Sequence, residues 1–169
     1  MTKPMPTPVV GGHHLSISNG DPLSGLTEYR SIVGALQYLT LTRPDIAFDN
    51  NQVCQFLHQP TTVHWLVVKC IPCYHNGMLT HGYSIHQALC ISVLIMMPIM
   101  LDLDDRRFTS GYCIYLGANL ISWSSKKQRC VSCYNTEPEY RQLAHTATTL
   151  SWLRALFLDL HLPVHCPKL

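Results

Sequence analysis

The sequence predicts an α+β fold in which a helical segment comes first and short strands and one long helix follow. Apolar residues recur at helical spacing between residues 27 and 76. Two β-rich stretches, at 111–116 and 120–124, flank a Gly-Ala-Asn turn and predict a hairpin. A long amphipathic pattern after Thr136 predicts the last helix. We therefore expect helices and strands to occupy separate parts of the chain.

Three parts follow from this pattern. Residues 1–26 are rich in proline and glycine and lack periodicity, which is typical of a linker. Residues 27–80 form the helical segment, and residues 81–169 form a domain of strands and a helix. No internal repeat is visible in the sequence.

The composition excludes several classes of protein. Only 13% of the residues are charged, and a net charge of +2 does not by itself indicate a nucleic-acid partner. The first residues lack the apolar region of a secretory signal. The apolar run at 88–101 contains Pro98 and is shorter than the roughly 20 residues of a membrane-spanning helix. We expect an intracellular chain without a membrane partner.

The helical segment contains start and stop signals for three helices. Thr27 is the expected N-cap of the first, and Pro44 suits the first position of the second. Thr61 or Thr62 caps the third, which ends near Gly77. The apolar residues that share one face of the first helix are Tyr29, Ile32, Val33 and Leu36.

In the second half of the chain, residues 129–132 are a candidate for one further short strand. Pro138 fits the first turn of the last helix, and Pro163 ends it. The apolar residues expected near one face of this helix are Tyr140, Leu143, Ala147, Leu150, Leu153 and Phe157.

Two of the cysteine motifs have the spacing of zinc ligands. Cys70 and Cys73 form one CxxC pair, and Cys130 and Cys133 form another. Zinc sites of this type usually separate the pairs by about 15–20 residues, and the separation here is far longer. The nearby histidines His64 and His75 are further candidate ligands. The alternative is four reduced thiols, and we expect no zinc.

Four stretches of the chain carry a family resemblance. They are YRSIVGALQYLTLTRPDIAF (29–48), NQVCQFLHQPTTVHW (51–65), DDRRFTSGYCIYLGANLISWSSKKQ (104–128) and TEPEYRQLA (136–144). In amino-acid sequence and in order along the chain, they resemble the copia-type retrotransposon polyproteins at the junction between reverse transcriptase and ribonuclease H. The resemblance implies a reverse transcriptase connection segment followed by a truncated ribonuclease H-like domain, with a partial mixed sheet and a long helix. The family enzyme cuts the RNA strand of RNA–DNA hybrids.

The chemistry of that family needs several carboxylates around two Mg²⁺ ions, which activate a water and stabilise the leaving oxygen. The resemblance implies a first acid in a motif like DADYAG before DDRR, and the matching residue here is Met96. It implies a second acid at Glu139, for which the alternative is a helix-start acid favoured by the dipole. The later acids would lie beyond Leu169. We therefore expect a vestigial Glu139, no bound Mg²⁺ pair and no catalysis.

A shift of reading frame accounts for the missing acid. The third base of the Met96 codon with the first two of Met97 gives GAT, aspartate, and the next shifted triplet gives GCC, alanine. The remaining shifted codons permit the rest of DADYAG. We infer two compensating insertions or deletions, one between about His86 and Met96 and one just before Asp104. The alternative is plain divergence. The nearby acids Asp102, Asp104 and Asp105 are expected to form a solvated loop rather than to replace the lost ligand.

The cations that could contact a nucleic-acid backbone are Arg106, Arg107, Lys126, Lys127 and Arg129, for which the alternative is ordinary surface charge. Where the family has KRxLRYLKGT, this chain has KCIPCYHNGM at 69–78, so arginines that would bind phosphate are replaced by cysteine. Each replacement needs one base change in a CGY codon.

Two functional hypotheses follow. The first is a non-catalytic relic of the polyprotein. The second is a retained module that binds nucleic acid, such as an RNA–DNA hybrid, weakly, or that binds another protein.

Overall fold

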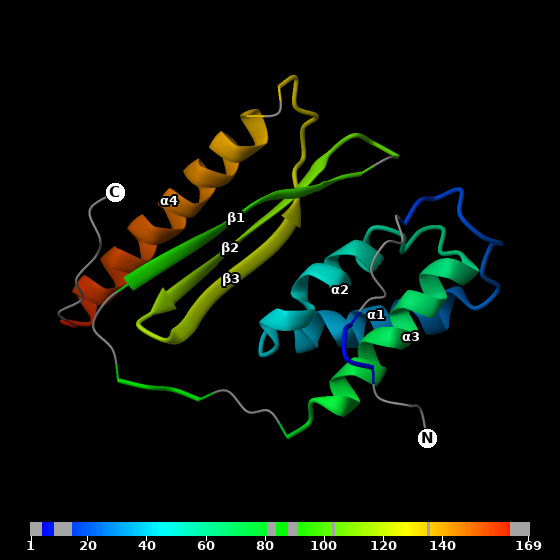
Figure 1. Cartoon of the computed structure of the whole chain (residues 1–169), viewed down its shortest axis with the longest axis horizontal. Coiled ribbons are helices and arrows are strands. Elements are labelled where there is room, and N and C mark those ends of the chain that lie inside the picture. The colour runs from blue at the N-terminus through cyan, green and yellow to red at the C-terminus, as the bar shows by residue number, and fades with distance from the viewer. Residues whose placement is uncertain are drawn as a thin grey trace. The chain divides into compact units, whose positions relative to one another are not determined.

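A computed structural model of the chain describes residues 5–8, 15–80, 84–87, 91–102, 104–134 and 136–162, and for residues 92–101 it describes the backbone. The fold is α+β, as predicted, and the chain divides into two compact units, residues 1–82 and 83–169 (Figure 1). The first unit contains helices, and the second contains a sheet and one long helix.

The helices of the first unit begin and end close to the predicted signals. Thr61 is the N-cap of the third helix, as predicted, and that helix ends at Gly77. The prediction of Thr27 as the first N-cap is wrong, because the helix begins at Leu26 and no side chain caps it. Glu28 in its first turn instead places a negative charge near the amide end of the helix dipole. The elements are α1 (Leu26–Leu39), the short 3₁₀ helix η1 (Pro44–Ile46), α2 (Ala47–Cys54) and α3 (Thr62–Gly77).

A buried histidine completes the start of α3. His64 is fully buried and stacks on Phe56 with ring centroids 3.9 Å apart. Its Nδ1 accepts a hydrogen bond from the Thr61 backbone N–H at 3.0 Å. Glutamate or glutamine usually makes this return bond of a capping box. Imidazole suits this position because one ring both accepts the bond and packs against an apolar neighbour.

The core of the first unit lies between its three α-helices. Tyr29 is fully buried there, and its hydroxyl donates to the Val53 carbonyl at 2.8 Å. The described part of the proline-rich start also contacts this unit, since Leu23 N–H donates to the Pro60 carbonyl at 3.0 Å. The buried hydrophobic residues of the core are Leu15, Tyr29, Val33, Leu36, Ile46, Val53, Phe56, Val67, Val68, Ile71 and Tyr74.

The second unit is a three-stranded antiparallel sheet with one helix packed on it (Figure 1). The strand order is β1-β2-β3, and no parallel pair occurs among the described strands, although a mixed sheet was expected. The predicted hairpin is confirmed and is longer than expected. The elements are β1 (Ile91–Leu101), β2 (Phe108–Leu116), β3 (Asn119–Lys127) and α4 (Glu137–Asp159).

The prediction of a strand at 129–132 is wrong. This segment is an irregular loop, and the side chains of α4 bind its backbone: Arg141 donates to the Cys130 carbonyl at 3.4 Å, and Glu137 accepts from Cys133 N–H at 2.9 Å. Backbone groups held by side chains in this way are not available for a sheet ladder. The strand that joins the hairpin in the sheet is instead β1, the methionine-rich run at 91–101.

Strand β1 accommodates a proline in an unusual place. Pro98 lies between Met96 and Met100, where the register with β2 shifts. Proline has no amide donor and is tolerated at bulges and on edge strands. Among the described strands β1 lies at an edge of the sheet, so both conditions hold. In the described part of the chain, the helices are too short or too polar to cross a bilayer.

One row of residues on the sheet packs against α4. Tyr112 and Ile114 of β2 form a small core with Ile91 and Leu153. The prediction that Tyr140 and Leu143 share the packed face of α4 is wrong, because Tyr140 is 71% exposed and Leu143 is also exposed. The buried residues of α4 are Pro138, Gln142, Thr146 and Leu153, so two polar side chains, Gln142 and Thr146, belong to the packed face.

Gly111 provides a test of the hairpin. A Cβ at this position would lie 2.5 Å from the Ser124 carbonyl oxygen, so Gly111→Ala should push the strands apart and destabilise the chain by about 1–3 kcal/mol. Gly34 on α1 is the matched control, because a Cβ there meets nothing within 4 Å. Gly34→Ala should be neutral or stabilise by about 0.5–1 kcal/mol. Urea unfolding measures both, and equal effects would contradict the close approach of β2 and β3 at Gly111.

Asp49 predicts a pH dependence of stability. This carboxyl is buried on α2, and burial, with the charge of Asp45, raises its pKa to about 6. Because this value is above that of the unfolded chain, about 3.9, the folded chain binds the extra proton and gains stability as pH falls from 7 to about 4.5. Asp49→Asn should stabilise the chain at pH 7 by about 1–3 kcal/mol and remove this dependence.

The control for this test is Asp45. A hydrogen bond from Arg43 lowers the pKa of Asp45, so its contribution is present at neutral pH and is lost only at more acidic pH. Asp45→Asn should therefore destabilise the chain at pH 7. Thermal unfolding from pH 4.5 to 7.5 measures both variants. If the curves of Tm against pH ran parallel for the unmodified chain and Asp49→Asn, they would contradict a raised pKa at Asp49.

Candidate functional site

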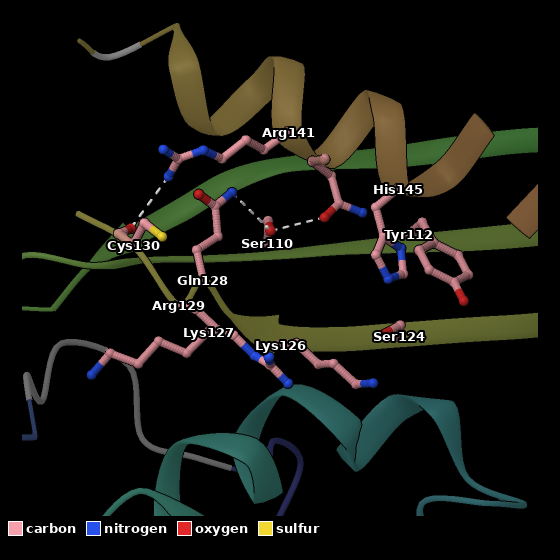
Figure 2. Close-up of a pocket in the computed structure, with 11 residues that line it drawn as sticks. Ser110, Tyr112, Ser124, Lys126, Lys127, Gln128, Arg129, Cys130, Arg141 and His145 are labelled. Atoms are coloured by element: carbon pink, nitrogen blue, oxygen red, sulfur yellow. Dashed lines mark hydrogen bonds between the residues drawn. The ribbon is translucent and has the colours of Figure 1, made fainter. Parts of the chain in front are cut away.

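A pocket of about 470 Å³ opens in the second unit (Figure 2). It lies where β2 and β3 meet the loop after β3 and the first turns of α4. The residues that line it are Ser110, Tyr112, Ser124, Lys126, Lys127, Gln128, Arg129, Cys130, Arg141, Gln142 and His145.

A chain of hydrogen bonds forms the polar floor of this pocket. Ser110 Oγ donates to Gln142 Oε1 at 2.8 Å, and Gln128 Nε2 donates to the Pro138 carbonyl at 2.9 Å and contacts Ser110 Oγ at 3.3 Å. Dashed lines in Figure 2 mark the hydrogen bonds of the Ser110 hydroxyl. Gln128 Oε1 is buried and accepts no hydrogen bond from the described residues. The floor is therefore held in place and keeps one acceptor for an added donor.

Positive charge surrounds this floor. Lys126 and Arg129 are exposed and pair with no carboxylate in the described part of the chain. Arg141 forms an ion pair with Glu137 one helical turn away, so part of its charge is compensated. His145 contributes a ring 5.9 Å from that of Tyr112. The free cations Lys126 and Arg129 would attract an anion to the pocket.

Lys127 lines the pocket but is already paired. Its ammonium contacts the carboxylate of Asp102 and lies 2.9 Å from Asp105 Oδ2. The side chains of Lys127 and Asp102 are only 18% and 14% exposed, respectively. The expectation of a fully solvated acidic loop is therefore wrong for Asp102. Its other oxygen accepts from Asp104 N–H at 2.8 Å, which shapes the turn between β1 and β2.

The remaining predicted cations lie outside the pocket lining. Arg106 is exposed in the turn between β1 and β2, with φ of 55°. Arg107 is half-buried, and its Nε lies 3.7 Å from Asp105 Oδ2. The structure thus brings Lys126, Lys127 and Arg129 to one pocket, and leaves the arginine pair in a neighbouring turn.

The two expected acid positions, 96 and 139, lie on different elements of the second unit, β1 and α4. Glu139 is exposed on the first turns of α4 and does not line the pocket. Met96 is registered opposite Gly111, in the strand row that alternates with the α4-packed row of Tyr112. Asp102 and Asp105 are the acids that do converge, and they bind Lys127. The described residues contain no cluster of three or more metal-ligating side chains, so the site does not fit two Mg²⁺ ions.

The two CxxC pairs lie in different units. Cys70 and Cys73 are half-buried on α3, and Cys130 and Cys133 are exposed in the loop before α4. The absence of zinc stays a prediction.

Sequence reasoning missed the floor of the pocket. Ser110, Gln128 and Arg141 were not among the predicted site residues. A signal was present, because Gln142 and Thr146 stand one turn apart on a helix face that is otherwise apolar. Polar residues at that spacing need buried partners, and strand β2 supplies one.

Comparison with known proteins identifies similar sequences and no similar solved structure. No protein-family model matches the chain, and no solved structure matches it. The chain is 39% identical over 98% of its length to the retrovirus-related Pol polyprotein from transposon RE2 of Arabidopsis thaliana. It is 44% identical over 90% of its length to an uncharacterized mitochondrial protein of the same plant. It is 35% identical over 74% of its length to the secreted RxLR effector protein 161 of Plasmopara viticola.

The matched proteins differ greatly in length. The chain spans 12% of the RE2 polyprotein. In contrast, the match covers 64% of the mitochondrial protein and 90% of the Plasmopara protein. Sequences similar to this segment therefore occur both within a long polyprotein and as most of a shorter protein.

Proposed function

We propose that this chain, which belongs to the copia-type retrovirus-related Pol polyproteins of transposons, corresponds to their ribonuclease H region. We propose further that it does not cleave RNA and that it binds the backbone of RNA–DNA hybrids through the pocket beside α4. The observation that carries the binding proposal concerns Lys126 and Arg129, two cations in the lining of the pocket that pair with no carboxylate among the described residues. The pocket floor also contains Gln128 Oε1, which accepts no hydrogen bond from the described residues.

The element order supports the assignment to the ribonuclease H region. Three antiparallel strands followed by a helix on one face agree with the first half of that fold as the sequence resemblance implies it. The helices α1 to α3 would then be the segment that connects it to the polymerase. Matches to shorter proteins support the idea that such a segment persists outside the polyprotein.

The chemistry of the pocket supports a nucleic-acid ligand over a neutral one. Phosphate oxygens pair with ammonium and guanidinium groups, and Arg129 can bind one phosphate through two N–H donors. Gln128 Oε1 can accept a hydrogen bond from a sugar hydroxyl, which an RNA strand carries. Few cations are free, so binding should be weak and strongly dependent on salt.

The arrangement of acids supports the absence of cleavage. Two divalent ions held close together repel each other, and only converging carboxylates compensate that repulsion. Here Glu139 does not line the pocket, Met96 stands where the sequence resemblance implies the first acid, and the converging pair Asp102 and Asp105 binds Lys127.

The first test is a cleavage assay. The unmodified chain should not cut a fluorogenic RNA–DNA hybrid with Mg²⁺ or Mn²⁺, and Met96→Asp should not restore cutting. The register gives the reason, because position 96 lies in the row of Gly111 rather than in the row that α4 packs against. Metal-dependent turnover by the unmodified chain that Glu139→Gln abolishes would contradict the proposal.

The second test is binding. The chain should bind a labelled hybrid in the micromolar range at low salt, and the slope of log affinity against log salt should be about −2 to −3. Lys126→Gln and Arg129→Gln should each weaken binding and reduce that slope by about one. Fluorescence anisotropy measures both quantities.

The matched control for binding is Arg154→Gln. Arg154 is exposed on α4 but does not line the pocket, so its replacement removes the same charge elsewhere. It should reduce affinity much less than Arg129→Gln does. Equal losses for all three variants would show that only net charge matters. The absence of binding and of cooperative unfolding would favour a relic without function.

A further inference from the structure

Among the described residues, the exposed thiols lie in one loop beside the pocket. Cys130 and Cys133 are exposed, whereas the other cysteines of the described residues are half-buried. Burial raises the pKa of the thiols of Cys54, Cys70 and Cys113, which lowers their reactive thiolate fraction. Thiol chemistry on the described part of the chain should therefore begin at this loop.

Cys130 belongs to the pocket itself. It lines the cavity together with Lys126, Arg129 and Arg141, and Figure 2 shows it beside Arg141. An anionic reagent drawn to these cations is brought to a thiol at the same time. A neutral reagent is not drawn to them in this way. The pocket thus gives Cys130 a preference for the charge of its reaction partner.

Two hydrogen bonds with α4 side chains hold the backbone at the two cysteines. The Cys130 carbonyl accepts from Arg141 at 3.4 Å, and Cys133 N–H donates to Glu137 Oε2 at 2.9 Å. Arg141 and Glu137 are themselves an ion pair on α4. The loop is therefore tied to the helix at both cysteines. CxxC spacing in such a turn permits a disulfide, as it does in thiol oxidoreductases.

We propose that Cys130 and Cys133 form a redox pair that reacts with small anionic disulfides drawn to the basic pocket. The Cys130 thiolate attacks one sulfur of the disulfide, which forms a mixed disulfide and releases one small thiolate. The Cys133 thiolate then attacks Cys130 Sγ, forms the internal disulfide and releases the second small thiolate. The two protein thiols lose two electrons, the small disulfide gains them, and the two protons end on the released thiols.

The other CxxC pair serves as an internal comparison. Cys70 and Cys73 have the same spacing, but they lie on α3 in the first unit, where they are half-buried and do not line the pocket. Burial, with the neighbouring Cys73, raises the pKa of Cys70. A difference in rate between the pairs therefore reports exposure and pocket charge, because the spacing is the same.

A consequence for binding rests on the proposed function. An anionic adduct on Cys130 would place negative charge beside Lys126 and Arg129, where the hybrid backbone is proposed to bind. Reaction with the disulfide should therefore weaken hybrid binding, and a reducing thiol should restore it. The thiol chemistry itself does not require nucleic acid, so the two proposals can fail separately.

The experiment treats the reduced full chain with glutathione disulfide and, in parallel, with the neutral hydroxyethyl disulfide, and follows each cysteine by peptide mass spectrometry. Glutathione disulfide should oxidise Cys130 and Cys133 before Cys70 and Cys73. The Cys133→Ser variant should trap one glutathione on Cys130. Lys126→Gln with Arg129→Gln should slow glutathione disulfide about three- to tenfold more than it slows the neutral reagent.

Three results would overturn the proposal. Equal rates at the two CxxC pairs would show that the loop has no special reactivity. Equal slowing of both reagents in the charge variant would remove the role of the pocket. A Cys133→Ser chain that carries no glutathione on Cys130 would exclude the mixed disulfide. Each readout is a mass or a rate on the protein, so failure of hybrid binding leaves it intact.

Discussion

The alternation of residues along strand β2 is the constraint on which most of the second unit depends. Tyr112 belongs to the row that packs beneath α4, and Gly111 belongs to the other row, where it lets β3 approach closely. A slip of one residue would exchange the rows and lose both contacts. The same row brings Ser110 to Gln142 and so forms the pocket floor. Through its pairing with Gly111, Met96 falls in the row that alternates with the α4-packed one.

Charge pairing decides which cations are available to a ligand. Lys126 and Lys127 are neighbours in sequence, yet successive residues of a strand lie on opposite faces. Lys127 meets Asp102 and Asp105 from the neighbouring turn and is neutralised, whereas Lys126 is left without a carboxylate among the residues that the structure describes. Together with the exposed Cys130, this leaves a small surface where positive charge and a thiol lie side by side. Hybrid binding and thiol exchange are both proposed for that surface, and both follow from its charge.

Local signals predicted most of the elements but not their packed faces. The proline of η1, the threonine cap of α3 and the Gly-Ala-Asn turn of the hairpin each determine the backbone of only a few neighbouring residues, so they can be recognised from the sequence alone. The packed face of α4 was misjudged because the helix has apolar residues on several sides, and periodicity alone makes Tyr140 an equally good candidate for that face. The loop at 129–132 has strand-like residues, but long-range bonds from α4 hold its backbone. Such bonds join residues whose sequence spacing carries no signal.

By itself, the sequence determined the α+β class and the family, and it supplied the set of candidate cations. These properties depend on residue identity and short-range order, which a chain shows without folding. Only the tertiary structure decided that Lys127 is neutralised, that Gln128 keeps a free acceptor, and that Cys130 shares a pocket with cations. Each of these properties depends on which side chain, distant in the sequence, contacts a given atom. That is set by strand register and helix packing, because the energies of pairing and burial act through space rather than along the chain.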